Sequence, residues 1–327
     1  MDLDFDPKKN ISRVDYLFAS LNITNKVNDL LTIRKIVKNW YDVLFFRLGM
    51  KKELVTKLRS GEVKHFKNQK EYFDFWNTKE AQEKLNKASR TKDLIKIKNG
   101  YVEFKWDSRN IKIHYQSSKQ LMDMLALIRE QFFNEQYKWL NVKGKVVVDI
   151  GANVGDTAIY FALRGANHVY AFEPYPFAYE TAVKNIKING LEDKVTILNE
   201  GCAGKIGKIT ITPKYQNVGG TDLKNFDKGK KINITTLGKL VERFGIKRAI
   251  LKIDCEGCEY GVILNSNQEK LKRFDQIMIE YHYGYMNLVS KLKENFEVQE
   301  KRPRYSFNKE ASNHDMYVGI LYCMKKT

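Results

Sequence analysis

Proline, cysteine and long apolar runs are all scarce in this sequence. Only five prolines occur in 327 residues, so proline-rich linkers do not mark domain boundaries. No apolar run approaches the roughly 20 residues that a membrane-spanning helix requires. The N-terminus, MDLDFDPKKN, lacks the apolar segment of a signal peptide. We therefore expect a cytoplasmic protein without a transmembrane segment.

The four cysteines are too few and too dispersed for a typical zinc site. Cys255 and Cys258 form a CxxC pair, whereas Cys202 and Cys323 are isolated. A tetrahedral zinc site usually combines two close pairs. We therefore expect no structural zinc, and we expect free thiols in a reducing compartment.

The net charge of +18 is shared between both halves of the chain. A nucleic-acid-binding protein usually concentrates its charge in a patch or an arm. A diffuse excess still favours anionic partners such as RNA, phosphorylated sugars or acidic lipid surfaces. The alternative interpretation is a lysine-rich composition that keeps a globular protein soluble, since 43% of the residues are hydrophobic.

The sequence pattern changes near residue 140. Before this point, apolar residues recur at helical spacing over residues 30–44 and 121–133. Asn99-Gly100 separates two alternating segments, 94–98 and 101–106, which predicts a β-hairpin. We expect residues 1–138 to form a mainly helical accessory domain that contains this hairpin.

Residues 139–327 show a repeated pattern of strand, turn and helix. Short apolar runs such as Val146–Val148 are typical of strands that are buried on both faces. The repetition predicts a doubly wound α/β domain, with a parallel sheet and helices on both faces. The expected sheet strands are 146–148, 168–172, 195–198, 249–253 and 277–281, followed by 296–298 and 316–323, and the expected exposed β segments are 206–212 and 231–235.

A glycine turn follows the first of these strands, in the segment VVVDIGANVGDTA. Gly151 and Gly155 allow the backbone to pass close to a ligand, because they carry no Cβ. Their G-x-x-x-G spacing differs from the G-x-G-x-x-G of a dinucleotide site. Asp149 and Asp156 would repel a diphosphate. The turn therefore predicts a ligand that is cationic at this point, such as S-adenosylmethionine with its sulfonium and amine.

An acidic residue ends the second strand. Glu173, followed by Pro174, lies 24 residues after Asp149. A carboxylate at this place lies beside the first loop and can accept hydrogen bonds from both ribose hydroxyls. Together with the glycine turn, Glu173 predicts a nucleoside ligand.

Carboxylates also cluster after the fourth strand, in LKIDCEGCEYG. Asp254, Glu256 and Glu259 lie where ligands bind in open α/β sheets, outside the carboxyl ends of the strands. Acidic residues are common at helix N-termini for electrostatic reasons, so a structural role for Glu259 stays open. Glu280 and His282, at the next strand end, point to one side of the sheet. His282 is suited to proton transfer near neutral pH, with a structural role as the alternative.

These segments closely resemble the FkbM family of class I methyltransferases. The resemblance rests on VVVDIGANVGDTA, YAFEPYPFAYETAVKNIKING, ITTLGKLVERFG, LKIDCEGCEYGVI and IMIEYH, in the family's order over about residues 145–285. It implies a Rossmann-like, mostly parallel sheet with an antiparallel last strand. It also implies S-adenosylmethionine as cofactor and usually O-methylation of sugar or polyketide-type hydroxyls. Cys255 and Cys258 occupy positions at which the family tolerates varied residues.

The resemblance further implies positions around the cofactor. The methionine side would be lined by Asp149, Gly151, Asn153 and Gly155, the ribose by Glu173 and Pro174, the adenine by Asn199, Glu200 and Cys202, and Asp254 would face the cofactor from the fourth strand.

Methyl transfer to a hydroxyl requires a group that accepts the hydroxyl proton. We expect His282 or Asp254 to accept it, with Glu280 as the third catalytic candidate and no metal ion. The competing hypothesis is a divalent ion bound by Asp254 with Glu256 or Glu280.

Two other functions stay open. An RNA or protein N-methyltransferase is favoured by the positive charge. Amino-directed enzymes of this fold, however, often carry Asp/Asn-Pro-Pro-aromatic after the fourth strand, where this chain has Asp254-Cys-Glu-Gly. The other is a non-catalytic scaffold that keeps the fold. We expect residues 1–138 to contact a small-molecule or glycan acceptor, and a homodimer surface is a second role for them.

Overall fold

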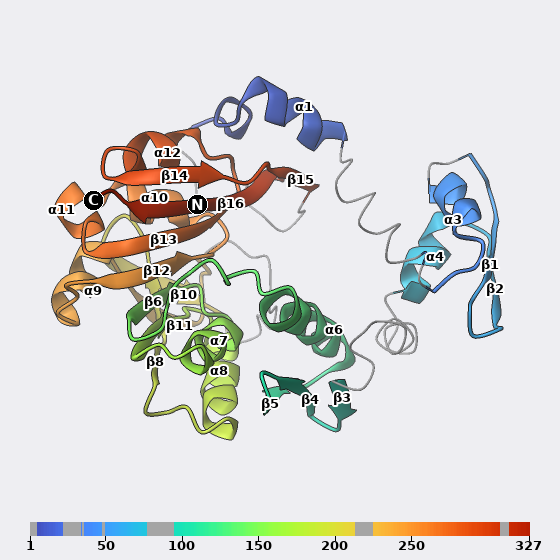
Figure 1. The fold of residues 1–327 in the computed structure, drawn as a ribbon, viewed down its shortest axis with the longest axis horizontal. Helices are drawn as coiled ribbons and strands as arrows, with labels where there is room; N and C mark the ends of the chain where they lie inside the picture. Colours follow the sequence, from blue (N-terminus) through green and yellow to red (C-terminus); the bar gives the residue numbers. More distant parts are fainter. Residues whose placement is uncertain are drawn as a thin grey trace. The chain divides into compact units, whose positions relative to one another are not determined.

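The computed structural model describes residues 5–21, 34, 36–47, 50–76, 95–212, 225–307 and 314–327 (Figure 1). None of the described helices combines the length and the apolar character that a membrane span needs.

A large, mostly parallel sheet forms the centre of the C-terminal part (Figure 1). Its strand order is β14-β16-β13-β12-β6-β7-β8, and β15 pairs with β16 outside this path. The bounds are β6 (Val146–Ile150), β7 (His168–Phe172), β8 (Val195–Leu198), β12 (Ala249–Ile253), β13 (Phe274–Tyr281), β14 (Phe296–Glu300), β15 (Arg304–Phe307) and β16 (Asp315–Lys325). Strands β8, β7, β6, β12 and β13 run parallel, whereas β16 is antiparallel to β13 and β14. The predicted mostly parallel α/β sheet, with its antiparallel last strand, is confirmed.

Helices connect successive parallel strands, as the crossover of a parallel sheet requires. They are α7 (Asp156–Leu163), α8 (Pro176–Ile188), α9 (Leu237–Arg243), α10 (Cys258–Leu264), α11 (Gln268–Leu271) and α12 (Met286–Leu292). Pro176 occupies the first turn of α8, where a missing N–H costs nothing. The last helix, α12, was not predicted from the sequence pattern.

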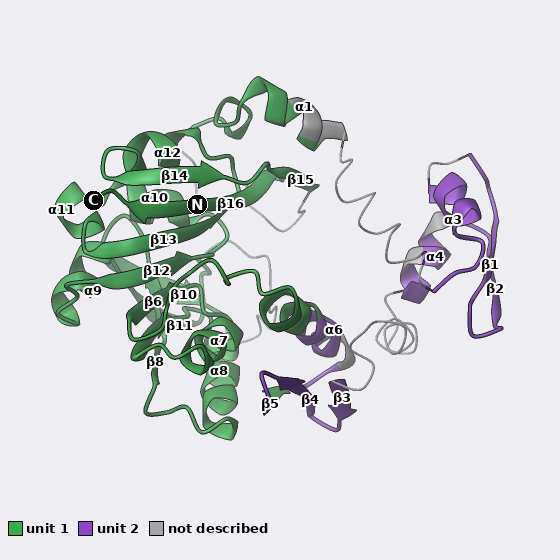
Figure 2. Ribbon diagram, viewed as in Figure 1, with its two compact units in different colours: residues 1–21, 112–114, 126–327 green, residues 22–111, 115–125 purple. Residues whose placement is uncertain are grey.

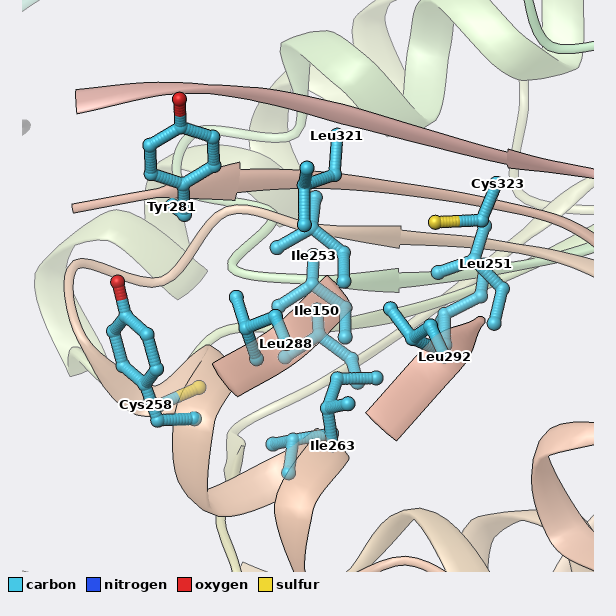
Figure 3. Packing of buried hydrophobic residues seen from close by; sticks show 14 of the residues in the cluster. Ile150, Leu251, Ile253, Cys258, Ile263, Tyr281, Leu288, Leu292, Leu321 and Cys323 are labelled. Carbon is cyan, nitrogen blue, oxygen red and sulfur yellow. The ribbon is translucent and has the colours of Figure 1, made fainter. Parts of the chain in front are cut away.

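One face of the sheet packs against α9, α10 and α12 in a continuous apolar core (Figure 3). Ile150, Leu251 and Ile253 contribute from β6 and β12, and each is at most 1% exposed. Ile263, Leu288 and Leu292 complete the core from the helices. Side chains on a strand alternate between faces, so Asp149 and Lys252 point to the opposite face. The apolar residues on one face therefore hold the strands against the helices. Polar residues on the opposite face remain available for a binding site.

The two predicted exposed β segments form a small separate sheet with a third strand. Its order is β10-β11-β9, from β10 (Gly207–Ile211), β11 (Lys230–Thr235) and β9 (Glu200–Cys202). Strand β9 follows β8 directly and was not predicted. Its pairing with β11 places Glu200 and Cys202 in regular structure beside the main sheet.

The chain divides into two compact units (Figure 2). The first comprises residues 1–21, 112–114 and 126–327, and the second comprises residues 22–111 and 115–125. Residues 126–138, which the sequence analysis assigned to the accessory domain, therefore belong with the sheet. They include η2 (Arg129–Phe133), which continues the predicted helix 121–133 after α6 (Ser118–Ile128).

The N-terminal residues of the first unit are tied to the end of β13. The segment contains η1 (Pro7–Lys9) and α1 (Arg13–Leu21). The Asn10 side chain donates to the carbonyl of Tyr283 at 3.0 Å, and the Asn10 carbonyl accepts from the N–H of Tyr285 at 2.7 Å. These bonds explain why residues near position 10 group with the end of a strand about 270 positions later.

The second unit has its own small core and two groups of strands. Its elements are α3 (Trp40–Arg47), α4 (Gln69–Trp76), β1 (Leu54–Lys57), β2 (Val63–Phe66), β3 (Ile95–Lys98) and β4 (Tyr101–Trp106), and β5 (Arg109–His114) ends at the boundary between the units. The predicted hairpin at Asn99-Gly100 is confirmed as β3–β4. Within the predicted helix over 30–44, α3 begins at Trp40, and residues 30–33 and 35 lie outside the described residues. The hairpin of β1 and β2 was not predicted.

Candidate active site

A cavity of about 280 Å³ opens at the carboxyl ends of β6, β7, β12 and β13. This is where ligands bind in open α/β sheets. Its walls are formed by Leu127, Glu130, Gln131, Ile150, Gly151, Asn153, Phe172, Glu173, Pro174, Tyr175, Ala178, Cys202, Asp254, Cys255, Glu256, Cys258, Glu280 and Arg304. The structure therefore brings together residues from all four sequence motifs.

The glycine turn after β6 needs its first glycine for close packing. Gly151 adopts φ +81°, and a Cβ at this position would lie 1.8 Å from the carbonyl oxygen of Asp254. Any side chain here would push apart the two turns that follow β6 and β12. Asn153 also has a positive φ, of 47°, and lines the cavity. Gly155 precedes α7 and packs against Ala182 instead of lining the cavity.

Asp149 lies beneath the glycine turn in a buried ion pair. Its Oδ1 is 3.0 Å from Lys252 Nζ, and the two side chains are 0% and 1% exposed. Lys252 also donates to the Gly151 carbonyl at 2.7 Å, and Thr157 Oγ1 donates to Asp149 at 2.6 Å. Asp149 thus supports the turn from behind and is not among the residues that line the cavity. Lys252 balances the negative charge that the sequence analysis assigned to the turn.

Glu173 is buried at the end of β7 with its carboxylate against the glycine turn. Its Oε2 accepts the Asn153 N–H at 2.8 Å, and its Oε1 accepts the Tyr175 N–H at 2.8 Å. Burial raises the pKa of Glu173 to about 7, although these two N–H groups lower it. Each oxygen keeps a second lone pair, so Glu173 can still accept hydrogen bonds from the hydroxyl groups of a ligand in the cavity.

The residues predicted near the adenine take different places. Cys202 is buried and lines the cavity. Asn199 donates to the carbonyls of Glu173 and Pro174, each at 3.0 Å, and so ties β8 to the turn after β7. Glu200 pairs with Arg243 at 2.8 Å. Of these three side chains, only that of Cys202 forms part of the cavity wall.

Carboxyl groups crowd the other end of the cavity. Glu130 from η2, Asp254 and Glu256 after β12, and Glu280 on β13 all line it, with Arg304 as the cation among the described lining residues. Burial and the charge of Asp254 raise the pKa of Glu280 to about 8. Burial also raises the pKa of Asp254 and Glu130. This end of the cavity therefore suits a ligand that brings positive charge.

His282 lies behind this wall, held between carboxylates. Nδ1 is 3.0 Å from Glu259 Oε1, and Nε2 is 3.1 Å from Glu256 Oε2 and 3.9 Å from Asp254 Oδ1. Glu259 is fully buried and also accepts the backbone N–H groups of His282 and Gly257, at 3.0 and 2.8 Å. Burial alone would lower the pKa of His282, but Glu256 and Glu259 raise it well above its usual range. The two carboxylates therefore favour the protonated form of His282.

Asp254, Glu280 and His282 also satisfy the spacing of a metal site. One potential ligand atom from each lies within 4.8 Å of the others. Neutral imidazole is required for metal binding, so an ion would have to displace the proton that His282 shares with Glu256. The set predicted from the sequence for a divalent ion included Glu256 in place of His282.

Several residues of the site were not found by sequence reasoning. Tyr137 Oη lies 3.3 Å from Asp254 Oδ2, and Gln136 Nε2 donates to Glu280 Oε2 at 3.0 Å. Both precede the predicted domain and belong to no motif. Lys252 carried a usable signal, because a charged residue inside the apolar run Leu251–Ile253 requires a buried partner.

The expectation of four free cysteines was wrong for two of them. Cys255 and Cys258 are joined by a disulfide, with Cα atoms 5.5 Å apart, whereas Cys202 and Cys323 are free and buried. The loop after β12 turns back sharply through Glu256 at φ 56° and Gly257 at φ 117°, which brings the two sulfurs together. This turn is a tertiary feature that the CxxC spacing alone does not reveal.

Comparison with known proteins points to one kind of domain. Among curated proteins, the chain is similar to ribosomal protein L11 methyltransferase from Carboxydothermus hydrogenoformans, with 51% identity over 55 residues, which cover 17% of this chain and 18% of that protein. It is also similar to protein arginine N-methyltransferase 1.1 from Arabidopsis thaliana, with 41% identity over 97 residues, 29% of this chain and 23% of that protein. The chain spans about a fifth of the length of these curated relatives.

Among solved structures, the chain is similar to M. capricolum TrmK in complex with S-adenosyl-homocysteine. The identity is 14%, the TM-score is 0.39, and the match covers 59% of this chain and 67% of that one. Residues 149–300 match the family model described as Methyltransferase FkbM domain. This range contains the glycine turn, Glu173 and both acidic strand ends. The part of the chain that forms the main sheet and the cavity is therefore similar to the FkbM methyltransferase domain.

Proposed function

We propose that this protein is an S-adenosylmethionine-dependent methyltransferase that methylates a hydroxyl group on a sugar, a glycan or a related small molecule. The observation that carries the proposal is the single cavity that collects Gly151, Glu173, Asp254 and Glu280 at four neighbouring strand ends. The bound cofactor would supply an electrophilic methyl group on a positively charged sulfur. The carboxyl-rich wall fits that charge, and the main task of the protein is then to align the acceptor.

The residues around the glycine turn fit the nucleoside part of this cofactor. Gly151 lines the cavity, and Glu173 offers lone pairs at the end of β7 for ribose hydroxyls. Cys202 provides an apolar wall, because burial raises its thiol pKa and keeps it neutral. In this proposal Asp149, with Lys252, acts as a positioning residue that holds the turn from behind.

The proton acceptor is Asp254 or Glu280 in this proposal, and His282 has a supporting role. Glu256 and Glu259 raise the pKa of His282 well above its usual range and so favour its protonated form, which is a poor base. Glu280 has a pKa of about 8, close to the value that suits a general base at working pH. Gln136 and Tyr137 would orient the two carboxyl groups, since they bond Glu280 and Asp254 respectively.

Activity measured with and without EDTA tests whether the carboxylates act without a metal. Activity that survives EDTA and falls at least about tenfold in Glu280→Gln would support this mechanism. Loss of activity in EDTA with recovery in magnesium would instead support the divalent-ion hypothesis at Asp254, Glu280 and His282. Retained turnover in Glu280→Gln and loss in Asp254→Asn would assign the base to Asp254.

Titration calorimetry with S-adenosylmethionine tests the function as a whole. Binding, followed by transfer of labelled methyl to a glycan or small-molecule fraction of a cell extract, is the expected result. No heat at high cofactor concentration would favour the non-catalytic scaffold. Glu180→Gln is a suitable control, because Glu180 is exposed on α8 and outside the cavity.

A second candidate is methylation of an amine or guanidinium group in a protein. Four carboxyl groups face the acceptor end of the cavity and would attract a cationic acceptor. One of the similar proteins is named as an arginine N-methyltransferase. The same carboxylates would repel an RNA backbone, so RNA is the weaker alternative. Methyl transfer to arginine peptides but not to glycans would favour protein methylation. RNA binding that falls steeply with salt would favour RNA methylation.

Residues 1–138 keep the proposed role of acceptor recognition, now restricted to the part outside the first unit. A chain without residues 22–111 should still bind the cofactor but lose discrimination between acceptors. Unchanged discrimination would contradict this role, and a changed sedimentation coefficient would support a dimer surface there. The cytoplasmic location is likewise a proposal, and fractionation of cells tests it.

A further inference from the structure

The loop that closes the acidic end of the cavity is cross-linked to itself. The Cys255–Cys258 disulfide encloses Glu256 and Gly257, which both have positive φ. A non-glycine residue such as Glu256 adopts this conformation only when its surroundings hold it there. The cross-link is one of the constraints that do so.

The same loop connects the cavity wall to His282. Glu256 Oε2 reaches His282 Nε2 at 3.1 Å from inside the cross-linked ring. Glu259, which follows the ring, accepts from Gly257 and from His282 and lies 3.5 Å from Cys255 Sγ. A change in the bond between the two sulfurs would therefore reach both carboxylates that hold the imidazolium.

The loop also packs against the glycine turn. The carbonyl of Asp254 fills the space that a Cβ of Gly151 would need, and Cys255 Cα lies 3.2 Å from that point. Both cysteines line the cavity, but only Cys255 is partly exposed, because Cys258 is 2% exposed. A small thiol that enters the cavity would therefore meet Cys255 first.

We propose that the Cys255–Cys258 pair is a thiol–disulfide exchange site that controls the binding of the nucleoside cofactor. In the exchange, a thiolate of a dithiol attacks Cys255 Sγ, and Cys258 leaves as a thiolate that takes up a proton. The second thiol of the reagent then displaces Cys255. The protein ends with two thiols, and the dithiol ends as a cyclic disulfide, so two electrons and two protons have been transferred.

Reduction releases Glu256 from its constrained conformation and loosens the wall beside Gly151. The reduced protein binds the cofactor more weakly as a result, and bound cofactor shields Cys255 from attack. This inference rests on the proposed function for the identity of the cofactor. The exchange itself depends only on the disulfide and on the exposure of Cys255.

The experiment compares the oxidised protein with protein reduced by dithiothreitol. Alkylation under denaturing conditions should label two cysteines before reduction and four after it, because Cys202 and Cys323 are free in both forms. Calorimetry with S-adenosylhomocysteine should give a dissociation constant at least about fivefold higher for the reduced form. Saturating S-adenosylhomocysteine should slow the reduction by a similar factor. Equal affinities together with equal reduction rates would overturn the proposal.

Variants separate the cysteine pair from general effects of the reductant. Cys255→Ser/Cys258→Ser should bind like the reduced protein and should not respond to dithiothreitol. Cys323→Ala keeps the pair and removes a cysteine in the apolar core, so it should respond like the wild type. A response that persists in the double variant would contradict the proposal.

A readout without cofactor keeps the test independent of the proposed function. The His282 imidazole resonances in an NMR spectrum should shift on reduction, because Glu256 leaves Nε2. If the oxidised protein binds no nucleoside, the proposed function is rejected. If, in addition, the His282 signal does not shift on reduction, the proposed thiol–disulfide exchange site is rejected as well. A shifted signal without nucleoside binding would retain the exchange and reject only the cofactor.

Discussion

Lys252 and Asp149 form an ion pair in the interior of the sheet, with Nζ and Oδ1 3.0 Å apart and almost no exposed surface. The pair links neighbouring residues in register on β12 and β6. Lys252 also donates a hydrogen bond to the Gly151 carbonyl. The charge of Asp149 and the conformation of the glycine turn therefore both depend on this lysine.

Replacement of Lys252 by methionine should destabilise the protein strongly. Removal of one partner leaves Asp149 charged and buried, which costs about 3–5 kcal/mol. Urea denaturation of Lys252→Met should show this loss. Lys272→Ala is the matched control, since its pair with Glu269 is exposed and should contribute at most about 1 kcal/mol. Equal midpoints for both variants would contradict the role of the buried pair.

Glu173→Gln should weaken cofactor binding by about 10–100-fold, the effect of one lost charge-assisted hydrogen bond. The shape of the side chain is kept, but one of its two acceptor oxygens becomes a donor. Calorimetry measures the affinity, and thermal unfolding measures the separate loss of the Asn153 or Tyr175 bond. Cofactor affinity equal to that of Glu180→Gln would remove Glu173 from the ribose site.

Stability should fall as pH rises between about 4.5 and 8. The folded-state pKa of Glu280 is raised from 4.5 to about 8, mainly by burial. Between these values the folded protein binds more protons than the unfolded chain, so the free energy of unfolding decreases with pH. The slope is at most about 1.4 kcal/mol per pH unit for each such group. Asp156 and Glu173, with pKa values of about 7, contribute in the same direction.

Urea denaturation at several pH values checks this slope. Glu280→Gln should reduce it, because glutamine does not titrate. A wild-type protein whose stability rises steadily from pH 5 to pH 8 would show that these carboxyl groups are ionised in the folded state.

Glu259→Gln should lower the pKa of His282, because a buried opposite charge is lost. The change keeps the hydrogen-bonding shape of the side chain. NMR titration of the His282 imidazole measures this pKa. His168, whose pKa is lowered by burial, serves as an internal reference. An unchanged His282 titration would mean that Glu256 alone holds the proton.

The sequence by itself determined the main sheet and the strand ends at which the cavity opens. Short, mainly apolar runs such as Ala249–Ile253 are typical of central strands, and their alternation with helices indicates parallel order. Gly151, Glu173 and Asp254 were located because strand ends of a parallel sheet meet at one edge. Local patterns carry this information, so no distant contact is needed to find it.

Only the tertiary structure decided the charge states and the partners. Asp149 proved to be paired with Lys252, and His282 proved to lie between Glu256 and Glu259, which raise its pKa. The disulfide of the CxxC pair arose from a turn that two positive φ angles create. Tyr137 and Gln136 contact Asp254 and Glu280, although neither belongs to a sequence motif. The pKa of a group and the bonds it forms depend on which groups lie next to it in space. The spacing of residues along the chain does not specify those neighbours.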